Sequence, residues 1–65
     1  MPIIHVELLE GRSVDQKRRL ATELTDAFVR TCGGDPAAVR VLLRDVPPTD
    51  WAIGGELVAD RAAAP

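Results

Sequence analysis

Apolar and polar residues alternate near the start of the chain, over residues 3–9 (IIHVELL). Ile4, Val6 and Leu8 occupy every second position, and most of the residues between them are polar. A period of two is typical of a strand with one face against a core. The pattern therefore predicts a first strand over residues 3–9, ended by Glu10-Gly11.

The apolar period changes to that of a helix after Ser13. Ser13 is followed three residues later by Gln16, which is the capping-box pattern at a helix start. Gly33-Gly34 provides the helix end, because glycine adopts the left-handed cap conformation without steric cost. Charged residues such as Lys17 are expected on the solvent side. The predicted core stripe consists of Leu20, Ala21, Leu24, Ala27, Phe28 and Cys32.

A second alternating segment follows the helix, over residues 39–46 (VRVLLRDV). Asp35-Pro36 before it predicts a short helical turn, with Asp as the cap and Pro at the first position. Pro47-Pro48 ends the strand. Residues 51–57 (WAIGGEL) hold two short apolar pieces around a pair of glycines, which indicates a hairpin or a strand that adds to a neighbour.

Two strands separated by one helix form a β-α-β unit, whose strands lie parallel with a right-handed crossover. The predicted fold class is therefore α/β (α+β), with a single β-α-β unit and a short C-terminal hairpin. Residues 1–65 form one domain, and residues from about 59 to 65 are expected to be a flexible tail.

The length of the chain, 65 residues, predicts a homo-oligomer. A domain this small offsets its conformational entropy poorly unless disulfides, a metal or partner subunits contribute. Cys32 is the only cysteine and His5 the only histidine, so a disulfide within the chain is excluded and a four-ligand zinc site is not expected. One face of the sheet would meet the helix, whereas the other carries Ile3, Leu9 and Leu42 and needs a cover from another subunit.

Composition excludes several classes of function. The formal net charge is −2, so the basic footprint of a nucleic-acid-binding protein is missing. No apolar run approaches the roughly 20 residues that span a membrane, and the N-terminus lacks the basic start of a signal peptide. A lone thiol fits a reducing compartment, and we expect a cytoplasmic protein.

The usual catalytic constellations are absent, and the N-terminus offers the one unusual group. His5 is expected to be a surface or interface side chain, and Cys32 a small buried hydrophobe. Initiator methionine is normally trimmed from Met-Pro, which leaves Pro2 with a free secondary amine. Partial burial and nearby cations would lower the pKa of that amine and make it an efficient base. Alternatively, Pro2 merely begins a strand, where a missing N–H costs nothing.

Four motifs in order carry a resemblance to a known family. They are Pro2 directly after Met1, LLEGRS with Arg12, VRV with Arg40, and WAIGGEL with Trp51. From residue 2 to about residue 58 the chain closely resembles the 4-oxalocrotonate tautomerase family. That resemblance implies β-α-β protomers in a hexamer, and conversion of dienols such as 2-hydroxymuconate into conjugated 2-oxo acids without a cofactor or metal.

The resemblance also implies roles for four residues, which in the family come from more than one subunit. Pro2 would be the general base and acid, and Arg40 would bind the carboxylate and oxygen at the reacting end. Arg12 would hold the far carboxylate. Trp51 stands where the family usually has phenylalanine, in the apolar wall. As alternatives, Arg12 pairs with Glu10, and Arg40 is a solvated or interface charge.

Other functions stay open at this point. The bulk and N–H donor of Trp51 suggest a reshaped pocket, and the stretch PPTDWAIGG also resembles family members from specialised biosynthetic pathways. A haloacrylate dehalogenase or hydratase would need an acid that activates water, for which Asp50 is the candidate. A non-catalytic oligomeric module that kept the fold is the last alternative.

Overall fold

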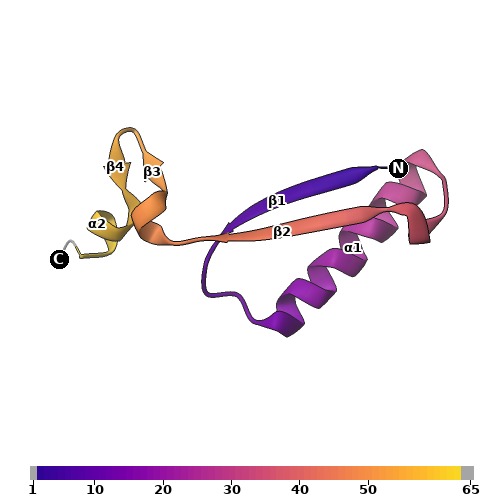
Figure 1. Cartoon of the computed structure of the whole chain (residues 1–65), viewed down its shortest axis with the longest axis horizontal. Coiled ribbons are helices and arrows are strands. Elements are labelled where there is room, and N and C mark those ends of the chain that lie inside the picture. The colour runs from indigo at the N-terminus through magenta and orange to yellow at the C-terminus, as the bar shows by residue number, and fades with distance from the viewer. Residues whose placement is uncertain (1, 64–65) are drawn as a thin grey trace.

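The computed structural model describes residues 2–63, which form a β-α-β unit followed by a small hairpin and a terminal helix (Figure 1). The elements in chain order are β1 (Ile3–Leu9), α1 (Val14–Cys32), the 3-10 turn η1 (Pro36–Ala38), β2 (Arg40–Val46), the 3-10 turn η2 (Pro48–Asp50), β3 (Ala52–Ile53), β4 (Glu56–Leu57) and α2 (Val58–Ala63).

The two long strands lie parallel, as the β-α-β pattern predicted. Their register places Ile3 opposite Arg40 and Leu9 opposite Val46. Helix α1 runs along one face of this sheet (Figure 1). The apolar residues of alternating positions turn to that face and are half-buried: Ile4, Val6, Leu8, Val41 and Leu43.

The predicted capping box is present at the start of α1, and the helix ends at the predicted glycine, although Gly33 with a ψ of −173° does not adopt the left-handed helical conformation. The Ser13 hydroxyl accepts from the Gln16 N–H at 3.1 Å, and the Gln16 side-chain oxygen accepts from the Ser13 N–H at 2.9 Å. At the other end Gly33 takes a φ of +79° and donates its N–H to the Val29 carbonyl at 2.9 Å. These bonds satisfy backbone groups that a helix end leaves unpaired.

Lys17 differs from its predicted place on the solvent side of the helix. Its side chain is 25% exposed, and its ammonium donates to Asp45 at the end of β2, with 2.6 Å between Nζ and Oδ2. The long aliphatic stem of lysine can cover apolar surface while the charged end finds a partner. The ion pair links the first turn of α1 to the C-terminal end of β2.

Cys32 is exposed, so the prediction of a buried cysteine was wrong for the single chain. It is the last residue of α1, whose 19 residues extend about 28 Å. The seven-residue strands extend only about 20 Å. The helix is therefore longer than the strands that it covers, and its last residue, Cys32, stays exposed.

Two boundaries also differ from the sequence prediction. β2 begins at Arg40 rather than Val39, because the Val39 N–H donates to the Pro36 carbonyl and ends η1. The first part of the tail predicted to be flexible from about residue 59 is helical, as part of α2. Arg61 pairs with Glu56 at 3.1 Å, and alanine favours the helix. Residues 64–65 of that tail, like Met1, lie outside the described residues.

The single chain is extended and has no fully buried residue within residues 2–61. Its accessible surface is 4972 Å², whereas a compact monomer of 7.0 kDa exposes about 4,000 Å². Its radius of gyration is 15.3 Å, against about 11 Å for a compact domain of this length. The predicted uncovered sheet face is present, with Ile3 56% and Leu42 50% exposed.

Helices long and apolar enough to cross a membrane do not occur within residues 2–63.

Candidate active site

Pro2 and Arg40 lie at the same end of the sheet. The Arg40 N–H donates to the Pro2 carbonyl at 3.0 Å, so the start of β2 holds the residue that precedes β1. Pro2 is half-buried, and Arg40 is exposed on the sheet face that α1 does not cover. The two strands thus fix the backbone of Pro2 next to the backbone of Arg40.

The guanidinium of Arg40 is held by the turn before its strand. Its Nη1 donates to the Ala37 carbonyl at 3.2 Å. Ala37 belongs to η1, which is capped by Asp35: the Asp35 Oδ1 accepts from the Ala37 N–H at 2.9 Å. The predicted Asp-Pro turn is therefore the element that positions this arginine.

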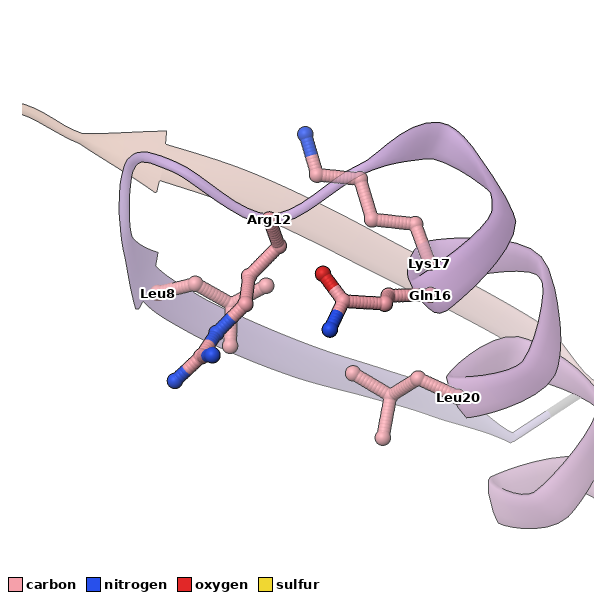
Figure 2. A pocket seen from close by; sticks show the side chains of 5 residues that line it. All are labelled: Leu8, Arg12, Gln16, Lys17 and Leu20. Carbon is pink, nitrogen blue, oxygen red and sulfur yellow. The ribbon is translucent and has the colours of Figure 1, made fainter.

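Arg12 lines a pocket at the opposite end of β1 (Figure 2). The pocket has a volume of about 190 Å³ and is open to solvent. Its lining combines two apolar side chains with three polar ones: Leu8, Arg12, Gln16, Lys17 and Leu20. Leu8 comes from β1, Arg12 from the following loop, and the rest from the first two turns of α1.

Arg12 and Arg40 carry uncompensated positive charge. Within residues 2–63 neither forms a salt bridge, so the predicted alternative of an Arg12–Glu10 pair is not seen. A guanidinium without an acidic partner is available to bind a planar carboxylate through two parallel hydrogen bonds. Each end of β1 therefore offers one such cation.

Trp51 and Asp50 lie beyond the far end of β2, where η2 leads into the hairpin. Trp51 is half-buried, and its carbonyl accepts from the Val58 N–H at 2.8 Å. Asp50 is exposed and accepts a hydrogen bond from the Thr49 hydroxyl at 3.2 Å. The hairpin and α2 pack on η2 and on each other, and they project away from the β-α-β unit (Figure 1).

One chain does not bring the predicted site residues together. Pro2 and Arg40 lie at one end of β1, whereas Arg12 follows its other end, and that strand is about 20 Å long. Trp51 comes after β2 has run to the same distant end. The arrangement gives two half-sites, one with the proline and Arg40, the other with Arg12 and the pocket.

His5, a further candidate for a catalytic role, lies outside both half-sites. His5 is exposed in the middle of the uncovered sheet face, opposite Leu42, as the sequence predicted for a surface side chain. In the part of the chain that the structure describes, no three His, Cys, Asp or Glu residues gather as metal ligands would. Gln16 is a pocket residue that the sequence identified only as a helix cap.

Comparison with known proteins gives consistent matches along the whole chain. The family model described as "Tautomerase enzyme" matches residues 2–61. A probable tautomerase of Ralstonia nicotianae is 35% identical over 65 residues, which is all of both chains. The crystal structure of TomN, a 4-oxalocrotonate tautomerase homologue in the tomaymycin biosynthetic pathway, is 44% identical with a TM-score of 0.94 and covers 97% of each chain. A heterohexamer 4-oxalocrotonate tautomerase from Chloroflexus aurantiacus is 38% identical with a TM-score of 0.87, over 92% of this chain and 97% of its own.

Proposed function

The chain belongs to the tautomerase family, and we propose that it catalyses cofactor-independent keto–enol tautomerisation with the amine of Pro2 as the general base. The substrate class is a 2-hydroxydienoate such as 2-hydroxymuconate, which becomes the conjugated 2-oxo acid. The observation that carries this proposal is the placement of Pro2 at the head of β1, paired through its carbonyl with the backbone of Arg40.

Pro2 supplies the proton transfer. Once Met1 is removed, its nitrogen is a secondary amine that takes the proton of the 2-hydroxyl group and returns a proton to the distal carbon, C5. A base works best when its pKa lies near the operating pH, and general acid–base catalysis of this kind contributes about 10²–10⁴-fold to rate. Its half-buried position favours the neutral amine.

Arg40 stabilises the charge that develops. As the hydroxyl proton leaves, negative charge grows on the oxygen and spreads over the dienolate. A guanidinium that is already held in place stabilises this charge without reorganising. The hydrogen bond to the Ala37 carbonyl supports that role, because it fixes one donor of the side chain and leaves others for the substrate.

Arg12 and Trp51 bind the rest of the substrate. The pocket at Arg12 receives the distal carboxylate, and the indole of Trp51 contributes to the apolar wall around the diene. The carboxylate contact orients the substrate, so that the reacting atoms meet the base.

A complete site requires more than one copy of the chain, and we propose a homo-oligomer, specifically a hexamer. The two half-sites of one chain are too far apart for one small acid to bridge. Antiparallel pairing of β1 with β1 of a second copy would bring the Pro2 end of one chain to the Arg12 end of the other. Within residues 2–63 the sheet consists of β1 and β2, so the outer edge of β1 is available for this pairing. The heterohexameric relative from Chloroflexus aurantiacus supports six subunits.

A specialised biosynthetic enol is the second candidate substrate. TomN, at 44% identity, functions in the tomaymycin pathway. The indole at Trp51 favours this candidate further, because it adds bulk and a hydrogen-bond donor to the predicted wall. The chemistry of Pro2 and Arg40 is the same for either substrate. A cytoplasmic location stays a prediction from the lone cysteine.

A screen of enol substrates tests the proposal. Purified protein with a free Pro2 amine, verified by N-terminal mass analysis, is expected to ketonise 2-hydroxymuconate or phenylenolpyruvate, followed by ultraviolet absorbance. Halide release from 3-chloroacrylate without ketonisation would favour a dehalogenase that uses Asp50. Activity towards neither class would favour the non-catalytic module.

Truncation of the two arginines separates their roles. Arg40→Ala is expected to lower kcat for 2-hydroxymuconate by about 10²–10³-fold, because a preformed donor to the developing oxyanion is lost. Arg12→Ala is expected mainly to raise KM, since it removes binding of a group that does not react. Steady-state kinetics checks both variants, with Arg30→Ala on the exposed end of α1 as the control. Equal effects of Arg12→Ala and Arg40→Ala on kcat would contradict the assignment.

A further inference from the structure

We propose that Gln16 is a substrate-binding residue whose amide NH₂ donates, beside Arg12, to the distal carboxylate of a dicarboxylate enol. This inference rests on the proposed function and names the substrate class that the Arg12 pocket selects. It assigns a second role to a residue that the helix cap already uses.

The capping box fixes which end of the Gln16 amide faces the pocket. The Ser13 backbone N–H can only donate, so the group that lies 2.9 Å from it is the Gln16 oxygen, Oε1. The NH₂ group must then lie on the other side of the amide plane. Figure 2 shows this nitrogen directed into the space between Arg12 and Leu20.

The amide nitrogen has no acceptor of its own within residues 2–63, where the recorded hydrogen bonds of Gln16 are the two of the capping box. The box therefore holds the side chain in one orientation and leaves two donors unused. A donor that is already oriented loses little conformational entropy when a ligand binds.

The other three pocket residues are not expected to bind the substrate carboxylate, so Arg12 and Gln16 remain as its ligands. Leu8 and Leu20 are apolar, and the Lys17 ammonium turns away from the Arg12 guanidinium (Figure 2) to pair with Asp45 at 2.6 Å. This pairing neutralises Lys17, so the pocket has one net positive charge, that of Arg12. A single substrate carboxylate would balance this charge.

The pocket is large enough to hold one end of a small substrate. Its volume of about 190 Å³ is below the roughly 300–1,000 Å³ of sites that enclose a whole drug-sized ligand. Leucines at its walls would contact the carbon chain, while the two donors take the carboxylate. A dienol with a second carboxylate fits this lining better than one that ends in a phenyl ring.

The presence of glutamine rather than glutamate at position 16 distinguishes a binding role from a capping role. Either residue can close a capping box, because both present an oxygen to the N-cap N–H. Glutamate would place an acceptor and a negative charge beside Arg12, where a substrate carboxylate is expected. Gln16→Glu therefore keeps the cap and removes the donor.

Kinetics of Gln16→Glu with two substrates tests this assignment. The ratio of kcat/KM for 2-hydroxymuconate to that for phenylenolpyruvate is expected to fall about tenfold or more, since a hydrogen bond to a charged group is lost and a repulsion is gained. The affinity for trans,trans-muconate, an unreactive dicarboxylate probe, is expected to fall by a similar factor in a calorimetric titration. A ratio and an affinity that both stay within about twofold of the wild type would overturn the assignment.

Ser13→Ala is the matched control, because it weakens the cap but leaves the Ser13 backbone N–H and the Gln16 amide in place. It is expected to lower the Tm and to leave the substrate ratio unchanged. An equal change in ratio for Ser13→Ala would mean that the cap, and not the donor, determines the preference. Failure of the wild type to ketonise either substrate would reject the proposed function instead, and the muconate titration would still decide whether Gln16 binds a carboxylate.

Discussion

Blocking the nitrogen of Pro2 is expected to lower kcat/KM for enol ketonisation by about 10²–10⁴-fold, the usual contribution of a general base. An N-terminal extension that is not cleaved converts the amine into an amide, which has no basicity, and leaves the rest of the chain intact. Pro2→Ala keeps a primary amine in place of the ring nitrogen and is expected to retain part of the activity. Initial rates for 2-hydroxymuconate measure both effects.

The pH dependence provides the control for this prediction. The neutral amine is the active form, so kcat/KM should rise with pH as the amine loses its proton. The same extension placed at the C-terminus should keep both the rate and this pH limb. An N-terminally blocked chain that retains wild-type kcat/KM would remove Pro2 from the mechanism.

The fold was largely predictable because its main signals are local. The alternation in residues 3–9 and the Ser13–Gln16 box each depend on a few neighbouring residues, and the structure has both. Apart from the local bond that shifts the start of β2, the errors concern relations between separate segments of the chain. Exposure of Cys32 depends on α1 being longer than the strands, and α2 depends on contacts such as that between Val58 and the Trp51 carbonyl. Neither relation appears in a short window of sequence.

The residue types of the proposed site could be named from the sequence, whereas their arrangement could not. Pro2, Arg12 and Arg40 stay predictions as site residues, and the sequence does not show that one strand separates Arg12 from the other two. Gln16 was identified only as a cap, because capping uses one end of its amide and the pocket faces the other end. The proposed second role of Gln16 was not apparent from the sequence, because the capping pattern already accounts for the residue.

Leu42→Glu is expected to abolish assembly and, with it, the native fold and all activity. Leu42 lies in the middle of the uncovered sheet face, opposite His5, and is 50% exposed in the single chain. If a second copy covers this face, the substitution buries a carboxylate in an apolar contact, which is strongly unfavourable without a partner. Sedimentation velocity should show loss of the proposed hexamer, and circular dichroism should show loss of helix.

Folding and assembly should be lost together, because no described residue of the isolated chain is fully buried. A chain without a core of its own has little to offset the entropy of ordering its backbone. Thr22→Glu is the matched control, since it introduces the same charge on the exposed face of α1, and it should leave mass and helix content unchanged. A stable, folded Leu42→Glu monomer would show that this sheet face needs no cover, and the two half-sites would then have to meet through another surface, such as the free edge of β1 alone.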